Sequence, residues 1–207
     1  MPLKSLTLAF DTSAAHCAAA LLCDGALLED QTVEMTKGQA EALMPMLEDL
    51  LSRHGFEYSD VTTLGVGVGP GNFTGIRISV SAARGLALSL GIKAVGVSTF
   101  EAQAWGIDRP LASIVPARKD NVYLQMLQDG GGTPPQFTTL DNALTQAGDL
   151  PVVGGPNGLS SCPLATGIAQ IATLRSSFTS ARPAPLYIRA ADAAPPRDPA
   201  PVILDQA

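Results

Sequence analysis

The fold is decided by one stretch, Val66-Gly67-Val68-Gly69-Pro70-Gly71-Asn72-Phe73-Thr74-Gly75-Ile76-Arg77, in which an apolar run meets a glycine-rich turn. The alternation of Leu64, Val66 and Val68 predicts a buried strand. The three glycines at 69, 71 and 75 permit positive φ and close backbone approach, and Pro70 stiffens the bend. Asn72 or Thr74 can cap a following helix. We therefore predict a strand-to-helix turn whose free N–H groups suit a phosphate or a carboxylate.

Two common phosphate-binding patterns do not fit this turn. A P-loop places a lysine after its last glycine, but the lysines nearest to the turn are Lys37 and Lys93. The pattern G-x-G-x-x-G also fails, because every register puts Pro70, Asn72 or Thr74 at its last glycine. At this point a nucleotide site and a tight turn without a ligand both stay open.

Outward from the turn, the first half of the chain alternates between strand and helix patterns. The periodicity predicts strands over 6–10, 16–23, 26–33, 64–68 and 92–97, and helices over 39–54, 75–90 and 98–105. Pro45 lies inside the first helical pattern, so that helix either kinks there or begins just before it. The order βββ-α-β-α-β-α is typical of a ribonuclease-H-like domain, which we expect to span 1–107.

The second half repeats this theme less clearly. We expect strands over 111–116, 122–127 and 152–153, and helices over 140–147 and 166–174. These would form a smaller α/β subdomain over 108–190, and the proline-rich segment 191–207 reads as a disordered tail. The predicted fold class is thus α/β with two subdomains, of which the second is reduced.

Composition limits the possible partners. The formal net charge is −6, so the basic surface that tight binding of nucleic acid requires is missing, and we expect any RNA contact to be made through a partner. No apolar run of about 18 residues predicts a membrane span. Three cysteines without C-x-x-C spacing and an N-terminus without signal-peptide layout favour a cytoplasmic protein.

Catalytic patterns are sparse. With two histidines and no metal-ligand spacing, we predict no metal site and no cofactor. Asp11, followed by Thr12 and Ser13, is the best catalytic candidate, because a carboxylate in this place organises the metal–phosphate water in actin-like ATPases. The alternative is that Asp11 caps its own turn. We expect no catalytic residues. A vestigial nucleotide site at 11–13 and a turn capped by Asp11 both stay open.

Two of these helices, the one over 39–54 and the one over 75–90, look suited to bind a partner. Both are apolar around most of their circumference, and the chain has little material to cover them. Arg77 adds to this, since a cation in the first turn of a helix opposes the macrodipole unless an anion sits beside it. A partner carboxylate or phosphate and an internal salt bridge are both possible. The predicted interface residues are Leu43, Met44, Leu47, Leu51, Arg77, Ser79, Ala82, Ala83 and Leu86.

These motifs resemble the TsaB family of bacterial tRNA threonylcarbamoyladenosine biosynthesis proteins over residues 5–190. Segment 69–78 is similar to the family signature Gly-Pro-Gly-Ser-Phe-Thr-Gly-Leu-Arg-Ile almost letter for letter. Segment 9–13 resembles the opening motif of the family, and segments 42–45 and 185–189 resemble other parts of the family pattern; these three matches are less specific. The chain departs from the family at Gln39, where a histidine is common, and at Pro116, where an aspartate is common.

The resemblance implies an actin-like ATPase fold that has lost catalysis. It implies a scaffold that pairs through the two helices with the paralogue TsaD, the transferase acting on adenosine 37 of tRNA, and is joined by the small ATPase TsaE. A homodimer through the same surface is also implied. The alternatives are an ATPase or sugar-kinase-like phosphotransferase of the same fold and, from an older family label, a peptidase.

Overall fold

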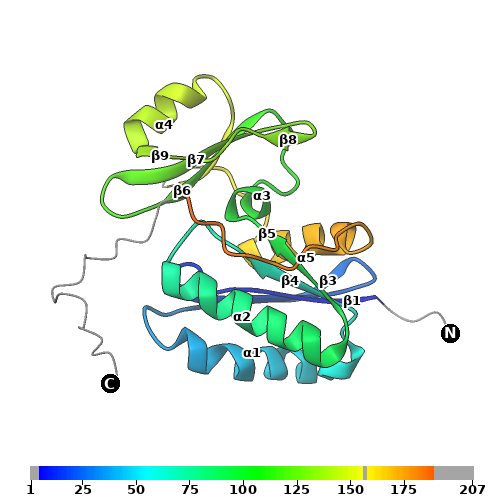
Figure 1. Cartoon of the computed structure of the whole chain (residues 1–207). Coiled ribbons are helices and arrows are strands. Elements are labelled where there is room, and N and C mark those ends of the chain that lie inside the picture. Colours follow the sequence, from blue (N-terminus) through cyan, green and yellow to red (C-terminus); the bar gives the residue numbers. More distant parts are fainter. Residues whose placement is uncertain (1–4, 156–157, 189–207) are drawn as a thin grey trace, which may run out of the picture.

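The first lobe is built on a five-stranded mixed sheet in the computed structural model of the chain, which describes residues 5–155 and 158–188 (Figure 1). The strand order is β3-β2-β1-β4-β5. The first three strands run antiparallel, whereas β4 and β5 run parallel to β1. This is the ribonuclease-H-like arrangement predicted from the order of elements. The strands are β1 (Leu6–Asp11), β2 (His16–Cys23), β3 (Ala26–Glu34), β4 (Thr63–Gly67) and β5 (Lys93–Val97).

Helices cover both faces of this sheet (Figure 1). On one face, α1 (Gln39–Arg53) and α2 (Phe73–Leu90) lie side by side on large side chains such as Leu8 and Phe10. On the other face lie α3 (Thr99–Gln103) and α5 (Leu164–Arg175). Here the sheet presents small residues, so α5 packs closely: a Cβ added at Gly65 would stand 3.0 Å from the Cβ of Ala172. Period-two alternation in the strands thus sorts the core into two layers.

The second lobe holds a smaller sheet of order β10-β6-β7-β8, with β9 also paired to β7. One helix, α4, covers one face through Ala143 and Ala147, which belong to the same apolar cluster as Ile114 and Leu124. The elements of this lobe are β6 (Leu111–Pro116), β7 (Asn121–Gln128), β8 (Gly131–Gly132), β9 (Gln136–Thr139), α4 (Leu140–Ala147) and β10 (Val152–Gly154).

Element ends follow local chemistry. The side chain of Asn72 accepts a hydrogen bond from the Gly75 N–H and begins α2, while Gly91 ends it in the left-handed conformation with φ 67°. Ser98 and Glu101 form the predicted capping box of α3. Pro45 lies inside α1, which begins at Gln39 without a break at the proline. The structure adds a 3₁₀ turn, Tyr58–Asp60, and the short strands β8 and β9, which we did not predict.

The lobes are not two consecutive stretches of sequence. Helix α5 lies within the predicted range 108–190 but packs on the sheet of the first lobe. Segment 183–187 returns to the first lobe as well, since the Leu186 N–H donates to the Val68 carbonyl. The lobe boundary therefore differs from the predicted one, and the predicted tail at 191–207 lies outside the described residues. No described helix is both long and apolar enough to span a membrane.

Candidate functional site

In the turn after β1, the carboxylate of Asp11 accepts hydrogen bonds from neighbouring residues of the chain. Asp11 is fully buried, and its Oδ1 accepts hydrogen bonds from the Ser13 N–H (2.9 Å), the Ser13 hydroxyl (2.9 Å) and His16 Nε2 (2.8 Å). The Ser13 hydroxyl thus donates to the carboxylate and not to a histidine. Because a nucleophilic serine needs a base that accepts its proton, this trio is not arranged as a hydrolase triad.

The second oxygen of Asp11 is enclosed. Asp11 Oδ2 is buried without a hydrogen-bond partner among the described residues, and it lies against Gly67 of β4. A Cβ at Gly67 would stand 1.8 Å from it. The hydrogen bond to Asp11 raises the pKa of the His16 imidazole above its ordinary value, although burial acts in the opposite direction. The Asp11 carboxylate therefore favours the protonated, positively charged form of His16.

The glycine-rich loop 69–75 closes onto this turn. The Asn72 N–H donates to the Ser13 carbonyl (2.6 Å), and the Thr12 hydroxyl donates to the Gly75 carbonyl (2.7 Å). A Cβ at Gly75 would stand 1.8 Å from the Thr12 carbonyl oxygen, and one at Gly71 would stand 2.3 Å from that of Ser13. The glycines are needed here because one backbone segment lies directly on another.

The loop offers fewer free N–H groups to a nucleotide phosphate than its sequence suggested. Two of the N–H groups that could have faced an anion are already taken, that of Asn72 by Ser13 and that of Gly75 by the Asn72 side chain. On its other side the loop is held by Thr99, whose N–H donates to the Gly69 carbonyl at 2.8 Å. The described residues contain no cluster of three or more His, Cys, Asp or Glu side chains that could hold a metal ion.

Arg77 projects outward from the same motif. Its guanidinium carbon lies 3.8 Å from the centre of the Phe73 ring, and its Nε donates to the Tyr187 hydroxyl at 3.0 Å. The rings of Phe73 and Tyr187 lie 4.9 Å apart. No carboxylate in the described residues forms a salt bridge with Arg77. The internal salt bridge that we left open is therefore not formed within this part of the chain, and the guanidinium is held in place by two aromatic rings.

Five of the nine predicted interface residues require correction, because they lie in the chain's own core. Leu43, Leu47, Leu51, Ser79 and Ala83 are each at most 1% exposed. The four apolar ones pack against the sheet, and the Ser79 hydroxyl donates to the Gly67 carbonyl at 3.1 Å. The small residues of α2 thus serve contact with its own sheet.

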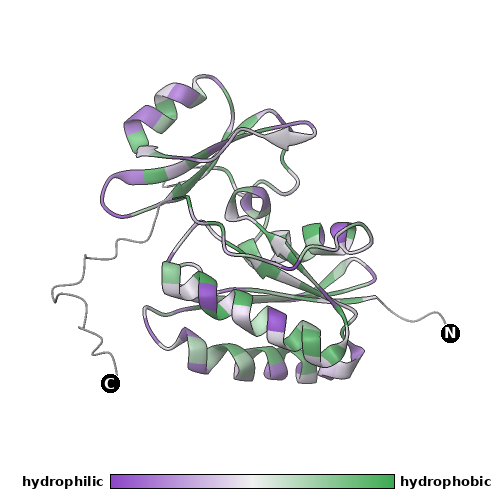
Figure 2. Ribbon diagram, in the orientation of Figure 1, coloured by the Kyte–Doolittle hydropathy of each residue, from purple (hydrophilic) through white to green (hydrophobic). Residues whose placement is uncertain are grey.

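The outer side of the two helices carries what a partner can reach. Met44 and Arg77 are exposed, and Ala82 and Leu86 are half-buried. Sequence reasoning missed Leu88, which is 84% exposed. It follows Phe73 and Arg77 at helical spacing, so period counting outward from Arg77 could have found it. Figure 2 shows α2 as a largely hydrophobic helix interrupted by two hydrophilic bands. We call Phe73, Arg77, Leu88 and Tyr187 the outer stripe.

A family model described as tRNA N6-adenosine threonylcarbamoyltransferase, TsaD, matches residues 33–192. The chain belongs to this family. The TsaD family match therefore spans both lobes and includes the glycine loop and the outer stripe. Together with the strand order of the first lobe, it identifies the fold as actin-like ATPase, α/β with a reduced second lobe.

Curated proteins and solved structures are also similar to this chain. The chain is 37% identical over 123 residues to the tRNA threonylcarbamoyladenosine biosynthesis protein TsaB of Escherichia coli K12, covering 56% of this chain and 52% of that one. It is 31% identical over 140 residues to TsaB of Bacillus subtilis 168, covering 66% and 61%. The chain thus spans about half the length of the first of these relatives. Among solved structures, YeaZ from Pseudomonas aeruginosa is 26% identical with a TM-score of 0.69, covering 89% of this chain and 100% of that one.

Proposed function

We propose that this protein is a non-catalytic scaffold subunit in tRNA threonylcarbamoyladenosine biosynthesis. In this role it binds a TsaD-like transferase that modifies adenosine 37, together with a TsaE-like ATPase, in the cytoplasm. It contacts tRNA only through that complex. Similarity to curated TsaB proteins supports the pathway. The closed turn at Asp11 supports the absence of catalysis, since its carboxylate and loop amides are already bonded within the chain.

The binding role rests chiefly on the environment of Arg77. A guanidinium normally pairs with a carboxylate or a phosphate when it is fixed in one geometry. Phe73 and Tyr187 hold Arg77 in place, and no acidic side chain of the described residues reaches it. Leu88 exposes an apolar side chain further along the same helix. A partner with an acidic group next to an apolar surface complements this stripe, either a TsaD-like subunit or a second copy of the chain.

The test is to mix the protein with the TsaD-like subunit of the same organism and to determine the mass of the complex in solution. We expect a heterodimer, with affinity reduced about tenfold or more by Leu88→Asp and by Arg77→Ala. The matched control is Leu144→Asp, because Leu144 is 45% exposed on α4 of the other lobe and its replacement should leave affinity unchanged.

Three results would contradict the proposal. Failure to associate, with tRNA modification intact after deletion of the gene, removes the scaffold role. Unchanged affinity in Arg77→Ala removes Arg77 as the anchor. Hydrolysis of ATP by the isolated protein, at a rate abolished by Asp11→Ala, would replace the scaffold with an enzyme of the same fold.

A further inference from the structure

Two adjoining cavities lie where α3 and α5 meet the β7–β8 hairpin. Their volumes are about 250 Å³ and about 480 Å³. They share three charged residues, Glu101, Arg109 and Arg175, and none of these belongs to the glycine loop or to the outer stripe. The larger cavity has the size of an ordinary small-molecule site.

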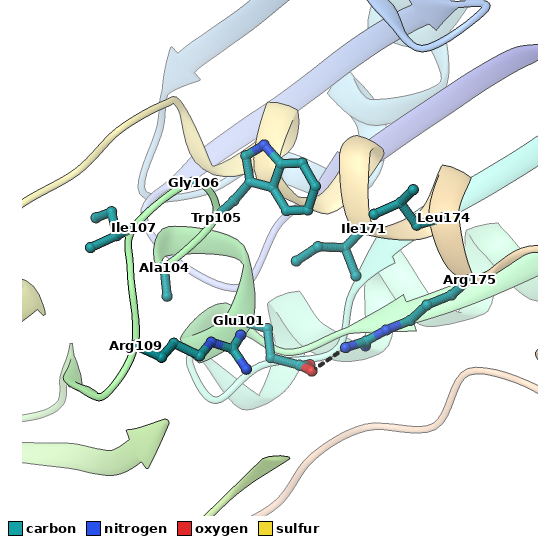
Figure 3. A pocket seen from close by; sticks show the side chains of 9 residues that line it. All are labelled: Glu101, Ala104, Trp105, Gly106, Ile107, Arg109, Ile171, Leu174 and Arg175. Atoms are coloured by element: carbon teal, nitrogen blue, oxygen red, sulfur yellow. Dashed lines mark hydrogen bonds and ion pairs between the residues drawn. The ribbon is translucent and has the colours of Figure 1, made fainter. Parts of the chain in front are cut away.

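One wall of the smaller cavity is apolar. It is formed by Trp105, Ile171 and Leu174, and Figure 3 shows the indole and Ile171 side by side above the charged groups. Leu174 is 61% exposed, although leucine normally gains free energy from burial. A flat apolar group placed against this wall would cover it.

The charges at the floor of the cavities are unequal. Arg175 Nη2 lies 2.5 Å from Glu101 Oε1, and Glu101 Oε2 accepts a hydrogen bond from the Ser98 hydroxyl at 2.8 Å. Burial pushes the pKa of Glu101 upward, but these hydrogen bonds outweigh it and hold the pKa below its ordinary value. The carboxylate is therefore ionised, and both of its oxygens are occupied.

Arg109 has no such counter-charge. Its Nη1 donates to the Gln128 carbonyl at 3.2 Å, and it forms no salt bridge within the described residues. In Figure 3 its guanidinium points toward Glu101 and Arg175. Two guanidinium groups thus converge on one carboxylate, which leaves a net positive charge in a protein whose formal net charge is −6.

We propose that these cavities bind a small molecule that carries a phosphate or a carboxylate on a flat apolar body. The anion lies between Arg109 and Arg175, because guanidinium forks match the geometry of both anions. The flat body lies against Trp105 and Leu174. This site is separate from the proposed scaffold function and does not depend on it.

The chain offers its own probe, because Trp105 is the single tryptophan in the sequence. The experiment titrates phenyl phosphate into the intact protein while tryptophan emission is recorded. Benzyl alcohol supplies the ring without the charge, inorganic phosphate the charge without the ring, and phenylacetate distinguishes a carboxylate from a phosphate. We expect saturable changes with phenyl phosphate or phenylacetate, and at least tenfold weaker binding of benzyl alcohol and inorganic phosphate.

Variants test the Arg109 guanidinium and the Glu101 carboxylate separately. Arg109→Gln should weaken binding about tenfold, since it removes one charge-assisted hydrogen bond. The matched control is Arg84→Gln, because Arg84 also donates to a backbone carbonyl, that of Pro183, and should leave binding unchanged. Glu101→Gln should tighten binding, because it removes the competing negative charge. Circular dichroism and thermal melting establish that each variant is folded.

The proposal is overturned if emission does not saturate up to about 10 mM of either aromatic anion, a weak limit for ligands of this size. It is also overturned if benzyl alcohol binds as tightly as phenyl phosphate, which would indicate an apolar surface alone. Equal affinity of folded Arg109→Gln and Arg84→Gln would show that the cavity charge plays no part.

Discussion

The inner and outer sides of one motif contrast sharply in this molecule. On the inner side, loop 69–75 and turn 11–13 satisfy each other's hydrogen bonds, and their backbones leave no room for a side chain. On the outer side, Arg77 of α2 has no acidic partner in the described chain. Leu88, three helical turns after Arg77, is 84% exposed. The residues that the fold itself requires are thus distinct from those that remain available to a partner.

The largest effect is expected where the two backbones meet. Gly75→Ala would place a Cβ 1.8 Å from the Thr12 carbonyl oxygen, so we expect a loss of about 3 kcal/mol or more in the free energy of unfolding. The matched control on the same helix is Gly85→Ala, since nothing lies within 4 Å of its added Cβ. That change should stabilise the protein by about 0.5–1 kcal/mol. Urea denaturation of both variants measures the difference, and equal stabilities would show that the loop is not closed.

A smaller effect is expected at the helix cap. Asn72→Ala removes the acceptor for the Gly75 N–H and should lower the free energy of unfolding by about 1 kcal/mol. Asn72→Asp keeps an acceptor and should retain most of the stability. If the alanine and aspartate variants melt at the same temperature, the cap does not stabilise the inner side.

Stability should also depend on pH through His16. Its pKa is raised in the folded protein above the ordinary value of 6.5, so the folded state binds the proton more tightly. The stabilisation is complete below pH 6.5 and is lost as pH rises through the folded pKa. Melting temperatures measured across this window should fall with rising pH in the wild type, and less so in His16→Gln. A parallel fall in both proteins would assign the effect to other groups.

The smallest effect is expected on the outer side. Tyr187→Phe removes the hydroxyl that accepts from Arg77 but keeps the ring beside Phe73. Because the group is exposed, we expect only a few tenths of a kcal/mol in stability. Affinity for the TsaD-like subunit should fall severalfold, as Arg77 is less firmly placed. A change in stability without a change in affinity would show that this contact stabilises the fold and does not serve partner binding.

Local chemistry predicted most of the fold from the sequence. Alternation in β1 and β4, the glycine stop after Leu90 and the capping box at Ser98 each act within a few residues, so their elements were found with ends near those observed. The strands β8 and β9 were missed because Gly131 and Gly132 carry no side-chain pattern and β9 has only four residues. The crossing of α5 back to the first lobe was also missed, since no local signal specifies the sheet on which a helix packs.

The sequence by itself determined the order of elements, the glycine-rich turn and the family resemblance, because each of these is written in residue type and spacing. Only the tertiary structure decided which side of α2 is free. A helix apolar on most of its surface does not reveal its buried face, and contact with the sheet assigned Ser79 and Ala83 to the core and Leu88 to solvent. Tertiary structure alone also brought Arg109 and Arg175 together, because 65 residues of intervening chain separate them.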